Sequence, residues 1–123
     1  MYQRILVGTD GSPTAALAVD RAVEVARAFR ATLTILSAGR PPRASLIVES
    51  EADRHARSGV KIETAVADGD AASALLDFVH NEGVDLLVVG NKGMTGASRF
   101  LLGSVPNKVS HHIASALLIV RTT

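Results

Sequence analysis

The sequence predicts one doubly wound α/β domain over residues 1–123, a five-stranded parallel sheet of order 3-2-1-4-5 with helices on both faces. Five short apolar runs recur along the chain, and segments with helical periodicity separate them. Three of these runs are continuously apolar, which is typical of parallel strands covered on both faces. A chain of 123 residues with 47% hydrophobic residues can also build one core without disulfides.

Each apolar run has the length of a strand. The first, fourth and fifth, "RILVG", "DLLVVG" and "ALLIVR", are the continuous ones. The second and third runs are "TLTILSA" and "VKIETAVA". The predicted strands cover residues 4–8, 32–38, 60–67, 85–90 and 116–121.

Three helices have clear start or stop signals. Ser12 is a good N-cap and Pro13 suits the first position of a helix that continues to about residue 30. Asp70 caps a second helix, and Gly83 ends it. Another helix begins at Ser104. Between the second and third strands, "GRPPR" predicts a turn, and the residues after it predict a helix with a weak apolar stripe.

Composition excludes several classes of protein. The chain has no cysteine, so it has no disulfide framework and no thiolate zinc site. There is no apolar run of 18 residues and no signal-peptide pattern, so we expect a cytoplasmic protein without a membrane segment. A net charge of +1 and 3% aromatic residues argue against a nucleic-acid surface.

The stretch "GNKGMTGASRFLLGS", residues 90–104, places four glycines after the most hydrophobic strand. Glycine lets backbone amides approach a ligand, and Gly103-Ser104 leads directly into a helix N-terminus, where anions bind. With strands 1 and 4 adjacent, "GTDGS" at 8–12 faces the same crevice. We therefore predict a phosphate site, near which Lys92 and Arg99 are either phosphate ligands or solvated charges.

The spacing Gly90-x2-Gly93-x9-Gly103-Ser104 resembles the nucleotide-binding signature of the universal stress protein family. The flanking "ILVGTDGS", "LLVVGNKG" and "LLGSVPNKV" are similar to the family's first strand, fourth strand and fourth helix. The resemblance covers the chain except roughly residues 40–59, where family members usually have a longer segment. This difference leaves open whether the second helix is truncated or a flexible loop is missing.

The resemblance implies binding of ATP with a divalent cation such as Mg²⁺ held through the phosphates, whereas some relatives prefer cyclic AMP. It implies that Asp10 holds the ribose hydroxyls and that Ala38 lies against adenine. It also implies that Gly8 and Thr9 lie near the base. Around the phosphates it implies Gly90, Gly93, Gly103, Ser104 and Val105. Lys92 and Arg99 complete the predicted nucleotide-binding residues, because their charges lie close to this stretch in the sequence.

The chain shows no arrangement of catalytic residues. No Ser-His-Asp pattern stands out, and Asp10 and Asp85 lie at opposite ends of their strands, too far apart for acid-base work. His55 and His80 stand alone and are predicted to be solvated, and no metal site is predicted. We therefore expect a regulatory nucleotide-binding protein. The alternatives are a slow ATP hydrolase or phosphotransferase, and an interaction module that works without ATP and leaves the glycine-rich loop empty. For Asp10 itself, the alternative to a ligand contact is a role as a turn former after the strand.

The last predicted strand also indicates an oligomer. The strand predicted over Ala116–Arg121 is apolar up to Val120, lies at an edge of the predicted sheet, and has no covering element after it. An exposed apolar edge strand favours pairing with a second copy. We expect a homodimer through this strand, and family members are similar in this respect.

Overall fold

A computed structural model describes residues 1–91 and 104–122 of the chain. Strands and helices alternate, and the five parallel strands form one sheet in the order β3-β2-β1-β4-β5, as predicted. The elements are β1 (Arg4–Gly8), α1 (Pro13–Phe29), β2 (Thr32–Ala38), α2 (Arg43–Arg54), β3 (Lys61–Ala67), α3 (Ala71–Glu82), β4 (Leu86–Gly90), α4 (Ser104–His112) and β5 (Ala116–Val120).

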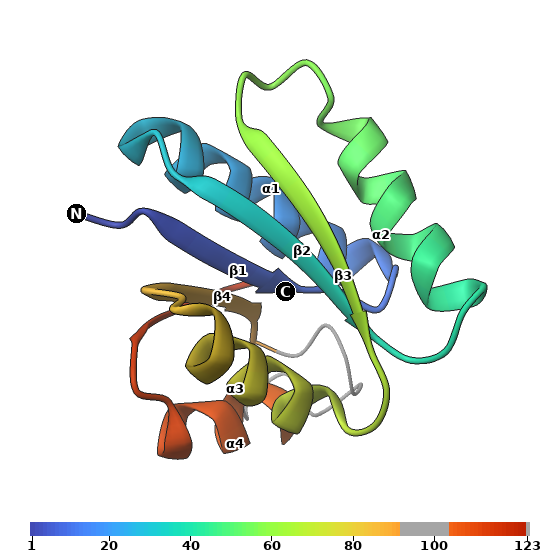
Figure 1. Cartoon of the computed structure of the whole chain (residues 1–123), viewed down its shortest axis with the longest axis vertical. Helices are drawn as coiled ribbons and strands as arrows, with labels where there is room; N and C mark the ends of the chain where they lie inside the picture. Colours follow the sequence, from blue (N-terminus) through green and yellow to red (C-terminus); the bar gives the residue numbers. More distant parts are fainter. Residues whose placement is uncertain (92–103, 123) are drawn as a thin grey trace.

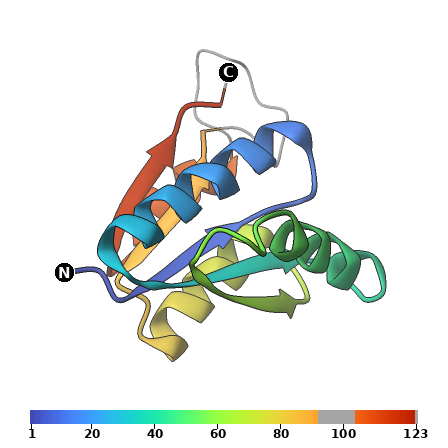
Figure 2. The ribbon, with the colours of Figure 1, turned by 90° about the horizontal axis from the view of Figure 1, so that it is seen from above.

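The helices form two layers on opposite faces of the sheet. Figures 1 and 2 show α1 and α2 on one face and α3 and α4 on the other. Side chains alternate accordingly: Ile5 and Val7 of β1 pack under α1, whereas Leu6 packs with Leu75 of α3. The sheet therefore separates two apolar clusters, both fully buried at their centres.

The predicted caps are present. The Ser12 hydroxyl accepts a hydrogen bond from Ala15 N at the start of α1, with Pro13 as its first residue. Gly83 takes the left-handed conformation that ends α3. Strands β3, β4 and β5 are each one residue shorter than predicted. At the amino end of β4, the Asp85 carboxylate accepts hydrogen bonds from Gln3 N and Arg4 N, far from Asp10 at the carboxyl end of β1.

The prediction that His55 is solvated is wrong. Its side chain is only 16% exposed, and Nε2 lies 3.0 Å from Asp20 Oδ1. Arg54 Nη1 contacts the same oxygen at 2.7 Å and also pairs with the nearly buried Glu51. Although partial burial opposes the charge of Arg54, its bonds to Glu51 and Asp20 hold its pKa above the ordinary value. This cluster fastens α2 to α1, because Asp20 lies on α1 and the other three residues lie on or directly after α2.

Asp70 both caps α3 and connects it to α4. Its Oδ2 accepts hydrogen bonds from Ser73 N at 3.0 Å and from Lys108 Nζ at 3.1 Å. The hydrogen bond from Ser73 N–H is the largest cause that holds the pKa of the Asp70 carboxyl below its ordinary value of 3.8, and the hydrogen bond from Lys108 is the second. No helix in residues 1–91 and 104–122 combines the length and apolar character needed to cross a membrane.

We predict that Asp70→Ala lowers the urea midpoint of unfolding at pH 7, whereas Asp77→Ala, which removes an exposed carboxylate of the same helix, leaves it nearly unchanged. Because the folded pKa of Asp70 is depressed, its stabilisation is present above the ordinary pKa and is lost as pH falls through the folded pKa. The difference between wild type and Asp70→Ala should therefore shrink below about pH 4. A difference that does not change with pH, measured by urea titration at pH 3 and pH 7, would contradict this role.

Candidate nucleotide site at the carboxyl edge of the sheet

The candidate site lies at the carboxyl ends of the central strands. β1 pairs with β2 on one side and with β4 on the other, so the direction of strand progression reverses between β1 and β4. The loops after β1 and β4 therefore leave the sheet side by side, which is where ligands bind in open α/β sheets. The carboxyl ends of β1 and β4 are therefore neighbours in the sheet, as the predicted strand order requires.

The loop after β1 is held by its own short hydrogen bonds. Asp10 Oδ1 accepts from Ser12 N at 2.9 Å, and Thr9 Oγ1 accepts from Gly11 N at 3.1 Å. Thr9 is fully buried and its N–H donates to Leu36 O at 2.9 Å. Asp10 is partly exposed, and its second oxygen, Oδ2, makes no hydrogen bond to a described residue. The loop is thus fixed by Thr9 and presents one carboxylate oxygen of Asp10.

Close packing explains why glycine occupies the two positions at the end of β1 and in the loop after it. A Cβ at Gly8 would lie 3.1 Å from the Leu75 side chain of α3. A Cβ at Gly11 would lie 3.1 Å from Ile47 of α2, and Gly11 also has a φ of +83°, which disfavours other residues. Helices from both layers therefore press against the loop that carries Asp10.

Asp10 and Ala38 line one cavity of about 250 Å³. The carboxyl end of β2 supplies Ala38, and the first turns of α2 supply the opposite wall with Arg43, Ala44 and Ile47. The cavity thus brings together the residues that the resemblance assigned to ribose and to adenine. The predicted helix with a weak apolar stripe is real, and its role as a wall of this cavity was not predicted.

A clasp between β4 and β5 holds the start of the glycine-rich stretch. Asn91 N donates to Val120 O at 2.8 Å, and Asn91 Oδ1 accepts from both the N–H and the hydroxyl of Thr122, at 2.9 and 3.0 Å. Asn91 directly follows Gly90, the last residue of β4. Sequence reasoning missed this pair, because the two residues are 31 positions apart and no local pattern in the sequence links them.

The phosphate side of the predicted site is only partly described. Lys92, Gly93, Arg99 and Gly103 lie outside the described residues. Ser104 begins α4, although its side chain also lies outside them. Val105 is buried in the cluster under α3 and α4, so that its side chain belongs to the core. Of the residues predicted to surround the phosphates, the structure thus describes Gly90, the backbone of Ser104, and Val105.

The described residues contain no group of three or more His, Cys, Asp or Glu side chains that would hold a metal ion.

Comparison with known proteins covers nearly the whole chain. The model of the universal stress protein family matches residues 1–53 and 39–121. Universal stress protein YxiE of Bacillus subtilis is 34% identical, with 98% of this chain and all of YxiE aligned. Universal stress protein Rv1636 of Mycobacterium tuberculosis is 37% identical over 99% of this chain and 98% of its own length.

A solved structure supports the same family. The crystal structure of a universal stress protein in complex with cAMP superimposes on this chain with a TM-score of 0.87 and 39% identity, over 99% of this chain and 98% of the chain in that crystal structure. The alignment with YxiE extends over 148 residues, more than the 123 of this chain, so it leaves gaps in this chain. The two family-model matches overlap at residues 39–53, a range that includes most of α2. With its family model, relatives and fold in agreement, the chain belongs to the universal stress protein family.

Proposed function

We propose that this chain binds an adenine nucleotide at the carboxyl edge of its sheet and acts as a small cytoplasmic regulatory protein of the stress response. The observation that carries the proposal is the cavity in which Asp10 and Ala38 meet, at the carboxyl end of β1, the strand that also pairs with β4. ATP is the ligand that the Gly90-x2-Gly93-x9-Gly103-Ser104 spacing favours.

In this proposal the ribose lies against Asp10. The bond from Ser12 N fixes one carboxylate oxygen, which leaves Oδ2 to accept hydrogen bonds from ribose hydroxyls. Ala38 is small and partly exposed, so a flat base can lie against it. Gly8 and Thr9 contribute by shape, because Gly8 lets α3 approach and the buried Thr9 holds the loop.

The phosphates then extend toward the start of α4. The first turn of a helix carries unpaired N–H groups and the positive end of the helix dipole, and both stabilise an anion. Gly90, Gly93, Gly103, Ser104 and Val105 would contribute mainly backbone N–H groups, while Lys92 and Arg99 would add mobile positive charge. Mg²⁺ would bind through the phosphate oxygens.

Cyclic AMP is the second candidate ligand, and two observations favour it. A relative that is 39% identical was solved in complex with cAMP. In the present chain, Arg40 and Arg43 line the cavity together with Asp10. Cations in that position would attract a phosphate that bridges the 3′ and 5′ oxygens of the ribose, as in cyclic AMP, and so stays close to the ribose.

We also propose a homodimer through Ala116–Arg121. β5 forms an edge of the sheet, and its residues from Ala116 to Ile119 are apolar yet only half-buried. Antiparallel addition of β5 from a second copy would satisfy the free backbone groups of this edge and cover its apolar side chains. Because Thr122 follows β5 and is bonded to Asn91, such a dimer would also steady the start of the glycine-rich stretch.

The central prediction concerns Asp10. Asp10→Ala should weaken binding of adenine nucleotides by about 10- to 100-fold, because hydrogen bonds to a charged group contribute about 1.5–3 kcal/mol. Isothermal titration calorimetry measures the affinity, and circular dichroism checks the fold. Asp53→Ala, which removes an exposed carboxylate of α2, is the matched control and should bind as wild type. Equal affinities for the two variants would overturn the assignment of Asp10.

A panel of ATP, ADP, AMP and cyclic AMP separates the two candidate ligands. An ATP site should lose affinity stepwise as phosphates are removed and should strengthen with Mg²⁺, since the metal bridges the phosphates. A cyclic AMP site should prefer the cyclic nucleotide without dependence on Mg²⁺, and Arg43→Ala should reduce that preference. We expect ATP turnover far below the typical enzyme value of about 10 s⁻¹. Turnover near that value would instead support the hydrolase, and no binding of any member at millimolar concentration would refute the site.

The dimer is tested by sedimentation. The 12.8 kDa chain should sediment at about twice its mass at micromolar concentration. A monomer under these conditions, with or without nucleotide, would show that β5 is not the interface.

A further inference from the structure

One face of the sheet lacks a helix over its edge. On the face that carries α1, the neighbouring helix α2 packs against β2 and β3. On the opposite face α3 packs against β1 and β2, and among the described elements none covers β3. In Figure 1 β2 and β3 face the viewer with no helix in front of them. On one face α2 lies over β2 and β3, whereas on the opposite face the space over β3, beside α3, holds no described helix.

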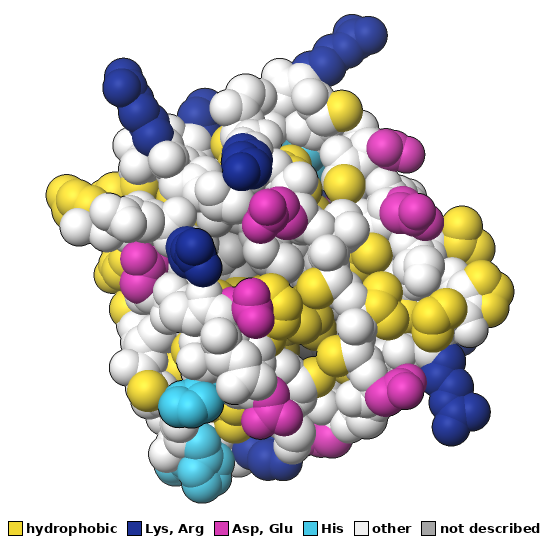
Figure 3. All heavy atoms as spheres, viewed as in Figure 1, with side chains coloured by type: hydrophobic (Ala, Val, Ile, Leu, Met, Phe, Trp, Pro, Cys, Tyr) yellow, Lys and Arg dark blue, Asp and Glu magenta, His cyan; other side chains and the backbone are white. Residues whose placement is uncertain are grey.

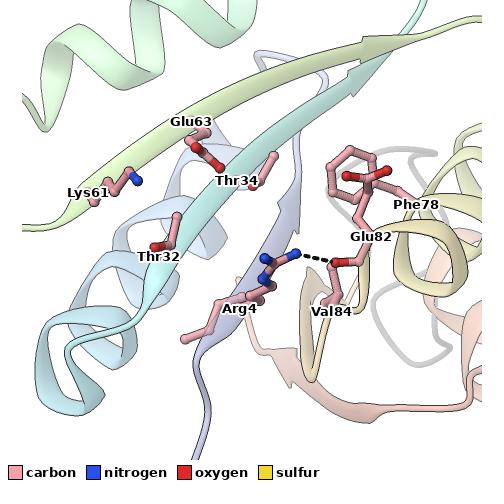
Figure 4. A pocket seen from close by; sticks show the side chains of 9 residues that line it. Arg4, Thr32, Thr34, Lys61, Glu63, Phe78, Glu82 and Val84 are labelled. Carbon is pink, nitrogen blue, oxygen red and sulfur yellow. Dashed lines mark hydrogen bonds between the residues drawn. The ribbon is translucent and has the colours of Figure 1, made fainter.

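This uncovered region is a groove between α3 and β3. Two adjoining cavities of about 310 and 440 Å³ share Phe78 and Glu82 of α3, and together they follow β3 from Lys61 to Ala67. Figure 4 shows Thr34 and Glu63 on the strands facing Phe78 and Glu82 on α3. The floor is polar at the Lys61 end, which suits exposure to water, and becomes apolar toward Ala67.

The dimensions of the groove match a short helix. Seven strand residues span about 23 Å, and the twelve residues of α3 along the other wall span about 18 Å. A helix of three to four turns is about as long as these walls. Helices pack about 8–10 Å from a neighbouring helix, so one placed beside α3 would lie above β3.

The groove has a strong charge bias although the whole chain is nearly neutral. Its lining carries five carboxylates and only two cations, Arg4 and Lys61. Arg4 already donates to the backbone oxygen of Glu82 at 2.8 Å. The carboxylates are Glu63, Asp68, Asp70, Asp77 and Glu82, and of these only Asp70 forms an ion pair with a described residue. Figure 3, viewed from the same side, shows an apolar hollow with acidic side chains around it.

This charge bias argues against a second copy as the occupant. A two-fold dimer through this face would place the same acidic surface on both sides of the interface. Like charges across an interface oppose association. The occupant that complements both features carries an apolar stripe for Phe78 and Ala67 and basic residues for the flanking carboxylates.

From these features we infer that the groove between α3 and β3 docks a basic amphipathic helix of a partner protein. The apolar stripe of the helix would cover the floor near Ala67 and Phe78, and its Lys and Arg side chains would pair with carboxylates on both walls. An interface of one short helix is small, so the complex is transient and salt-dependent. The groove shares no lining residue with the cavity that contains Asp10, so this inference does not depend on the proposed nucleotide site.

The test uses a fluorescein-labelled twelve-residue helical peptide with a leucine stripe flanked by lysines. We expect saturable binding to the full chain by fluorescence anisotropy. A variant that reverses one charge on each wall, Glu63→Lys with Asp77→Lys, should bind the peptide at least tenfold more weakly. The matched control is Glu49→Lys with Asp53→Lys, which makes the same charge change on exposed residues of α2 and should bind as wild type.

Amide shifts in a two-dimensional NMR spectrum locate the contact. Peptide-induced shifts confined to β3 and α3 support the groove, and circular dichroism shows whether each variant is folded. Equal binding by the groove and control variants, or shifts centred on another face, would overturn the inference. Self-association that Glu63→Lys with Asp77→Lys abolishes would also overturn it, because the occupant would then be a second copy.

Discussion

The pairing of β1 with β4 is the constraint on which the rest of the structure depends. Residues Ile5 to Val7 lie beside Leu86 to Val88, and all six are almost completely buried between the two helix layers. This pairing joins the first half of the chain to the second half at the centre of the sheet. Because both strands are parallel, it also brings the exits of β1 and β4 together. The candidate site thus results from the same contact that builds the core.

Much of the fold was predictable because its signals are local. The continuous apolar runs reflect burial on both faces, and the caps at Ser12, Asp70 and Gly83 are read from single residues in their immediate context. The strand order was predicted from the doubly wound pattern, and the register of β1 with β4 agrees with it. The meeting of Asp10 and Ala38 in one cavity follows from that order, since β2 lies beside β1.

The features that were missed depend on contacts between distant parts of the chain. His55 has no signal in the sequence for its partner Asp20, which is 35 positions earlier. The Asn91–Thr122 clasp likewise depends on β4 and β5 lying side by side. The bare face of β3 was also not visible in the sequence, because its alternating pattern is compatible with either a solvated or a covered face. These contacts, and the uncovered face of β3, can be recognised only once the strands and helices are in their places in the folded chain.

The helix α2 connects these observations. At its beginning, Ile47 packs on Gly11 and Arg43 lines the cavity with Asp10. At its end, Arg54 and His55 hold it to Asp20 of α1. An ion cluster held between two helices resists displacement, because moving either helix leaves partly buried charges without partners. The wall of the cavity is therefore positioned from the far end of the same helix. This clamp thus ties the end of α2 to α1, while the beginning of the same helix lines the cavity with Asp10.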